Sequence, residues 1–101
     1  MKIEFGGGEN PKRPNYIQVD VRKINDNTLV CNAWDVDKHV DEGSVTEIYS
    51  RHFFEHLTHQ QAQRTLDAWY KICKKGARIE LICPNMNLHL CLLYTSDAAD
   101  E

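Results

Sequence analysis

The chain has 101 residues, a length that corresponds to one small domain. Its hydrophobic content of 42% and charged content of 27% are typical of a globular protein and exclude a disordered chain. A net charge of -3 without a long basic run argues against a nucleic-acid-binding surface. The four cysteines form no C-x-x-C pair, which argues against a disulfide framework or a zinc ribbon. Neither a signal peptide nor a membrane-spanning run is present, so we expect a cytoplasmic protein without a membrane partner.

The first informative stretch is a short apolar run that three glycines follow. Ile3 to Phe5 predicts a buried strand, and Gly6–Gly8 would let the backbone turn sharply and approach a ligand closely. Glu4 lies near the carboxyl end of this strand, where open α/β sheets bind their ligands. A glycine triplet also suits a hairpin loop or a disordered start of the chain, so only the rest of the sequence can decide its role.

Four more strands are predicted along the chain, and each is rich in β-branched, aromatic or aliphatic residues. If the first two strands are parallel, about ten residues must connect them, so the usual crossover helix would be very short or absent. Strands that alternate with a clear helix indicate a parallel α/β sheet. The predicted strands are Tyr16–Val21, Thr28–Cys31, Val45–Ser50 and Ala77–Cys83.

One long helix is predicted to begin at Thr58. Thr58 and Gln61 fit a capping box, which satisfies backbone N–H groups at the helix start. Lys74 and Lys75 suit the negative end of the helix dipole, and Gly76 suits its termination. The predicted core-facing stripe of this helix consists of Ala62, Leu66, Trp69, Tyr70 and Cys73.

The last residues, Cys91 to Glu101, resemble the translation of an adaptor used in sequencing libraries and show no periodicity continuous with what precedes them. We therefore expect residues 1–90 to be part of a domain and residues 91–101 to be a non-native tail. On this reading the sheet is truncated after its fifth strand. An exposed fifth strand would favour self-association of the fragment.

The order of these signals resembles the class I S-adenosylmethionine-dependent methyltransferases, in particular small bacterial members with a shortened first helix. The resemblance spans roughly residues 2 to 90 and implies a Rossmann-like, doubly wound parallel sheet. It rests on short segments in the family's order: Ile3–Gly8, Tyr16–Asp20, Cys31–Asp35, Glu42–Ser50, Phe54–Leu57, Lys75–Arg78 and Cys83–Asn85.

The resemblance also implies roles for single residues around S-adenosylmethionine. The loop Gly6–Gly8 with Glu4 and Phe5 would lie beneath the methionine part, where N–H groups meet a carboxylate and Glu4 meets a cation. Asp20 would accept hydrogen bonds from both ribose hydroxyls. The remaining assignments are Val21, Ala33 and Trp34 against the adenine ring, Asn32 at its amino group, Ser50 and Arg51 beside the reactive centre, and His52 at the substrate or as a base.

The resemblance implies direct transfer of the methyl group to a small-molecule or other acceptor. Proximity and in-line alignment are often sufficient for this reaction. Because the family fold continues beyond the fifth strand with elements that help to form the substrate pocket, we expect this chain by itself to be inactive.

Other readings stay open at this point. His52, Glu55 and His56 match H-x-x-E-H, an inverted zinc-peptidase signature that requires both histidines on one helix face. The same scaffold could instead serve as a non-catalytic binding or interaction module, because a fold does not determine a function. A dinucleotide fingerprint would need glycine where Pro11 stands, and no P-loop lysine follows the glycines.

Overall fold

The fold was described from a computed structural model, in which residues 1–7, 10–83 and 86–91 are described, the last range by its backbone alone. Strands and helical segments alternate along most of the chain. In order they are β1 (Lys2–Phe5), β2 (Ile17–Asp20), β3 (Thr28–Val30), the 3-10 helix η1 (Ala33–Lys38), β4 (Val45–Arg51), the 3-10 turn η2 (Phe54–His56), α1 (His59–Ile72), β5 (Cys73–Cys83) and β6 (Met86–Cys91).

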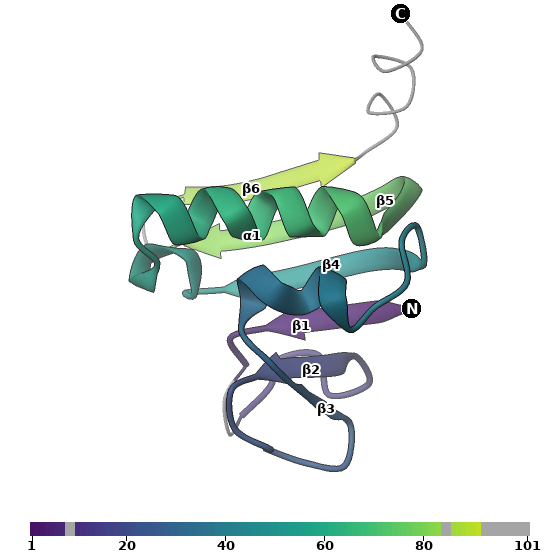
Figure 1. Ribbon diagram of the computed structural model, residues 1–101. Coiled ribbons are helices and arrows are strands. Elements are labelled where there is room, and N and C mark those ends of the chain that lie inside the picture. The colour runs from purple at the N-terminus through teal and green to yellow at the C-terminus, as the bar shows by residue number, and fades with distance from the viewer. Residues whose placement is uncertain (8–9, 84–85, 92–101) are drawn as a thin grey trace, which may run out of the picture.

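The strands form one sheet in the order β3-β2-β1-β4-β5-β6. The pairs from β3 to β5 are all parallel, whereas β6 runs antiparallel to β5 (Figure 1). The chain therefore steps outward from β1 to β3 and then crosses to the other side of β1 with β4. Open α/β sheets bind ligands where the order of the strands reverses, so this topology directs attention to the carboxyl ends beside β1.

The five predicted strands are confirmed, with ends that shift by a few residues. Ile3 of β1 pairs with Ile17 of β2 and Ile48 of β4, which aligns the apolar residues of the three strands on one face. Within the described part of the β1–β2 connection, residues 6–7 and 10–16, there is no helix. This agrees with the expected short crossover.

The core lies between this apolar face and a layer formed by α1 and η1 (Figure 1). Trp69 of α1 is fully buried, and its ring lies 4.9 Å from that of Phe5 and 5.2 Å from that of Phe54. Tilted ring pairs at such distances add to the stabilisation that burial of apolar area provides. The aromatic cluster therefore joins β1 to α1 and to the segment that precedes it.

The start of α1 is confirmed by a complete capping box. The backbone N–H of Gln61 donates to Thr58 Oγ1 over 3.1 Å, and the N–H of Thr58 donates to Gln61 Oε1 over 3.0 Å. The predicted stripe is correct at Trp69 and at Leu66, which is partly buried against the core, but wrong at Tyr70, which is 49% exposed. The buried face is instead rotated toward Thr65, Ala68, Trp69 and Ile72.

The predicted end of α1 is wrong. The helix ends at Ile72, and β5 begins directly at Cys73, so Lys74, Lys75 and Gly76 belong to the strand. Cys73 already pairs with Val45, and the register between β4 and β5 then shifts before regular pairing resumes. Gly76 has a left-handed backbone conformation (φ 85°) and lies within this irregular part of the strand, so it does not end a helix.

A sixth strand was not predicted. Because β6 pairs with β5 along its whole described length, the sheet does not end at the fifth strand, and the edge expected to drive self-association is covered. Cys91 is the last residue of β6, although it was assigned to the non-native tail. Residues 92–101, the rest of that predicted tail, lie outside the described residues. Among the described residues, no helix is long and apolar enough to cross a membrane.

Candidate functional site

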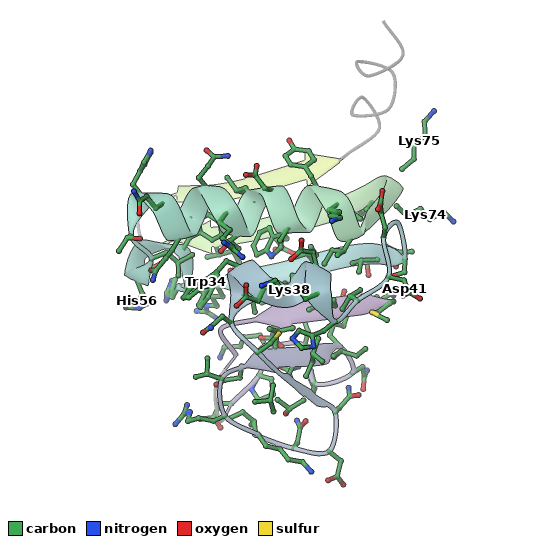
Figure 2. All side chains as sticks on the ribbon, viewed as in Figure 1. Trp34, Lys38, Asp41, His56, Lys74 and Lys75 are labelled. Atoms are coloured by element: carbon green, nitrogen blue, oxygen red, sulfur yellow. The ribbon has the colours of Figure 1, made fainter. Side chains whose placement is uncertain are left out.

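A cavity of about 340 Å³ opens at the edge where the parallel strands end. It joins the turn after β1, the end of β2, the residue after β3 and the start of η1. Six of the predicted cofactor residues line it: Gly6, Asp20, Val21, Asn32, Ala33 and Trp34. Residues that are distant in the sequence thus come together where the sheet topology places ligands. Figure 2 shows Trp34 at this edge, whereas Asp41 and Lys74 lie at the opposite one.

Gly6 forms the sharp turn out of β1. Its φ is 77°, in the left-handed region that favours glycine, and an added Cβ would lie only 2.7 Å from the Cβ of Phe53. Phe53 itself lines the cavity, so the close approach of these two residues defines one of its walls. Gly8 lies outside the described residues.

Asp20 lies at the carboxyl end of β2 with most of its side chain covered. Its Oδ1 accepts a hydrogen bond from the backbone N–H of Arg22 over 2.9 Å, and the Arg22 guanidinium lies 3.7 Å away. The backbone oxygen of Asp20 accepts from the N–H of Cys31, which fixes the end of β2 to the residue after β3. In the described part of the chain, no donor reaches Oδ2, so this oxygen is available to a ligand.

The segment from Asn32 to Trp34 is held from the side of α1. Arg64 of α1 donates from Nε to the Trp34 carbonyl oxygen over 3.4 Å and from a terminal nitrogen to Asp35 Oδ1 over 3.1 Å. Partial burial raises the pKa of Asp35, but hydrogen bonds from Lys38 and Asn32 and the Arg64 charge outweigh it and lower the pKa overall. Asp35 is therefore a charged anchor for the wall of the cavity that η1 provides.

Glu4 does not line the cavity. It faces the opposite side of the sheet from Ile3 and Phe5, and its buried carboxylate accepts hydrogen bonds from the backbone of Lys12 and Arg13. We predicted that Glu4 lies near the cationic part of a cofactor, but in the structure its carboxylate binds the β1–β2 connection. Gly7, at the turn, packs against this carboxylate and not against the cavity.

Phe5 was also predicted to contact the cofactor, but it is fully buried and does not line the cavity. Its ring packs between those of Trp69 and Phe53. Phe5 therefore supports the cavity wall from within the core, through Phe53.

The residues expected beside the reactive centre lie at the end of β4, one strand away from the cavity. Ser50 is fully buried on the core face, and its hydroxyl has no hydrogen-bond partner among the described residues. Arg51 and His52 are exposed at the same edge of the sheet. His52 has a φ of 51°, and its backbone N–H donates to the carbonyl of Ile82. This left-handed conformation is uncommon for a residue with a Cβ, although histidine adopts it more often than most residues do.

Five lining residues were not predicted: Val19, Arg22, Cys31, Phe53 and Leu57. Cys31 directly follows β3, and burial, together with the charge of Asp35, raises the pKa of its thiol. Cys31 is the last residue of the predicted strand Thr28–Cys31, and this place at a strand end was a usable signal. Phe53 and Leu57 offered none, because they reach the cavity only through the turn after β4.

The zinc signature does not adopt the geometry that it requires. His52 follows β4 in a left-handed conformation, whereas Glu55 and His56 belong to η2, so no single helix face carries both histidines. Among the described residues, no group of three or more His, Cys, Asp or Glu side chains could hold a metal ion.

The sequence matches no protein-family model and no curated protein. Among the solved structures that match, two do so over 79% of this chain. A SAM-dependent methyltransferase from Archaeoglobus fulgidus superposes with a TM-score of 0.70 at 19% identity, over 42% of its own length. A protein from Methanococcus maripaludis, to which S-adenosyl-L-methionine-dependent methyltransferase activity has been ascribed, gives 0.66 at 14% identity, over 46% of its length.

The chain thus spans less than half of the length of either relative. The match includes the parallel sheet, which confirms the predicted Rossmann-like fold class. At the level of the fold, it also confirms the resemblance that the sequence suggested. This chain has the α/β fold of the S-adenosylmethionine-dependent methyltransferases.

Proposed function

We propose that this chain is the cofactor-binding part of an S-adenosylmethionine-dependent methyltransferase. The observation that carries the proposal is the cavity at the ends of β1, β2 and β3, which combines a glycine turn, a strand-end carboxylate and the start of η1. A fold alone hosts many functions, so the proposal depends on this site and uses the likeness of the two solved structures as support.

The residues that line the cavity fit the parts of this cofactor. Asp20 has one carboxylate oxygen without a donor among the described residues, which suits hydrogen bonds from the ribose hydroxyls. Val21, Ala33 and Trp34 supply the apolar surface that an adenine ring requires. Asn32, at the start of η1, offers an amide to the polar edge of the base.

When bound, the cofactor would supply an electrophilic methyl group to a nucleophile on the acceptor. The protein's part is to hold the two reactants in this alignment and to exclude water. Gly6 brings backbone close to the ligand, and Asp20 fixes its ribose. Arg51 at the end of β4 and His52 directly after it would contact the acceptor, and His52 would take up its proton.

The acceptor is a small molecule or another molecule with an exposed nucleophile. Because the chain spans less than half of the two related structures, we expect that it binds the cofactor without turning it over. The complete acceptor site would need residues beyond the described sheet.

Calorimetric titration with S-adenosylhomocysteine tests the proposal, with Asp20→Ala as the test variant and Asp26→Ala, an exposed turn residue, as the control. Loss of the ribose hydrogen bonds should weaken binding by about tenfold or more, since two bonds to a charged group are removed. The control should bind as wild type does. If the wild-type chain is folded but does not bind the ligand, a non-catalytic interaction module is favoured instead. Saturable binding of zinc would contradict the proposal and favour a metal site at the H-x-x-E-H segment.

A further inference from the structure

Glu4 is the most deeply buried carboxylate of the described side chains, with 1% of its surface exposed. Its Oε2 accepts a hydrogen bond from the backbone N–H of Lys12 over 2.9 Å, and its Oε1 accepts one from the N–H of Arg13 over 2.8 Å. Both donors belong to the connection between β1 and β2. Removal of a buried carboxylate that is paired in this way would leave both backbone N–H donors without an acceptor, which destabilises the fold.

Gln18 of β2 completes the cluster. Its side-chain amide donates to Glu4 Oε1 over 3.2 Å and to the carbonyl oxygens of Arg13 and Tyr16 over 3.0 and 3.1 Å. Glu4 and Gln18 are paired across the parallel strands, so the cluster is built on the rigid part of the sheet. One acid and one amide thus bind the backbone of the connection at three residues.

The glycine turn lies directly on this cluster. A Cβ added at Gly7 would lie 2.9 Å from Glu4 Oε2 and 2.8 Å from Gln18 Oε1. Gly7 in turn follows Gly6, which lines the cavity. The carboxylate therefore supports the turn from the side that faces away from the ligand site.

The side chain of Arg13 fastens the connection at a further point. Its guanidinium lies 4.2 Å from the centre of the Tyr49 ring on β4 and 3.5 Å from a carboxylate oxygen of Glu80 on β5. The Arg13 guanidinium therefore makes a cation–π contact and an ion pair at the same time. The connection is thus fixed to the sheet over four strands although it contains no helix in its described part.

We infer that Glu4 is a positioning residue that anchors the glycine turn in place of a crossover helix, which the described part of the connection lacks. This inference rests on the proposed function, since it concerns the turn that would lie against the cofactor. In related folds a helix after the first strand presents its N-terminus to the ligand and holds the turn. Here the backbone N–H groups of residues 12 and 13 are satisfied by the carboxylate, which holds the turn ready for binding.

Hydrogen exchange of the ligand-free, full-length chain tests the anchor directly. In Glu4→Gln, one acceptor oxygen becomes an NH2 group, so at least one of the two amides, that of Lys12 or that of Arg13, should exchange about tenfold faster than in wild type. Glu47→Gln is the matched control, because Glu47 lies on the same face but binds the side chains of Lys2 and Tyr16. Unchanged exchange at both amides in Glu4→Gln would overturn the inference.

Ligand binding distinguishes an anchor from a direct contact. S-adenosylmethionine carries a sulfonium cation, and S-adenosylhomocysteine carries a neutral thioether in its place. If Glu4 acts through the turn, Glu4→Gln should weaken both ligands by the same factor, whereas a direct charge contact would weaken the sulfonium ligand more. A selective loss of the cationic ligand would contradict the positioning role.

A second variant covers the case in which Glu4→Gln does not fold. Gly7→Ala keeps the carboxylate but pushes its oxygen away from the turn, and it should raise exchange at the same two amides. Normal protection in this variant would count against the anchor. The exchange measurements need no ligand, so a wild-type chain that fails to bind either nucleoside would disprove the proposed function and leave the test of the anchor intact.

Discussion

Gly6 and Gly43 have nearly the same backbone conformation, with φ values of 77° and 71°, but different surroundings. A Cβ at Gly6 would meet Phe53 at 2.7 Å, whereas a Cβ at Gly43 would meet nothing within 4 Å. An alanine at Gly43 would therefore add only the strain of a left-handed backbone, whereas an alanine at Gly6 would add this strain and a steric clash with Phe53.

We predict that Gly6→Ala lowers the free energy of unfolding by about 1 kcal/mol or more beyond the effect of Gly43→Ala. Both variants carry the backbone strain of about 1–3 kcal/mol, but only Gly6→Ala also displaces Phe53 from the cavity wall. Urea unfolding measures the difference. Equal losses in the two variants would show that the close contact with Phe53 does not constrain the turn.

At the level of single residues, the sequence indicated strand ends but not the partners that come from a connection. Asp20, Asn32 and Trp34 line the cavity; the cofactor contacts assigned to them came from the resemblance to methyltransferases and stay predictions. The role of Glu4 could not be predicted, since its donors are backbone N–H groups of Lys12 and Arg13, and almost any residue type can provide these.

At the level of elements, α1 and η1 form one unit through Arg64. Its guanidinium reaches the Trp34 carbonyl and the Asp35 carboxylate, and it is more than half exposed, so it contributes little to global stability. Its importance lies in fixing the part of η1 that carries the predicted adenine contacts.

We predict that Arg64→Ala weakens binding of S-adenosylhomocysteine several-fold, below the factor of about ten that 1.4 kcal/mol would give, and leaves the unfolding midpoint almost unchanged. The control is Gln63→Ala, because the Gln63 side chain donates to Asp67 within the same helix. Arg64→Lys should restore part of the affinity through the Asp35 ion pair. A large drop in the unfolding midpoint with normal affinity would assign Arg64 a purely structural role.

The start of α1 was predictable because the capping box involves residues close in sequence, Thr58 and Gln61. Its end was not, because Lys74, Lys75 and Gly76 have the composition of a helix end but are drawn into β5 by pairing with a distant strand. The short helix η1 was missed for a related reason. Its residues are held by Arg64, 29 positions after Asp35.

At the level of the whole molecule, the sheet order and the site depend on each other. Because β1, β2 and β3 are parallel, their carboxyl ends meet at one edge, and the cavity lies there, beside the point between β1 and β4 where the strand order reverses. Alternating strands and the helix predicted a parallel sheet but did not predict the order of its strands. The pairing of β6 with β5 could not be predicted, since nothing in Met86–Cys91 indicated an antiparallel strand.

The most direct test of the central claim is to map S-adenosylhomocysteine on the isotope-labelled chain by NMR. We predict that the backbone amide shifts that change on titration cluster at Gly6, at residues 20–22 and at residues 32–34, which line the cavity. Amides near Asp41 and Lys74, at the opposite edge of the sheet, should stay unchanged. Shifts confined to that opposite edge, or none at saturating ligand with the fold intact, would contradict a cofactor site at the carboxyl ends of the strands.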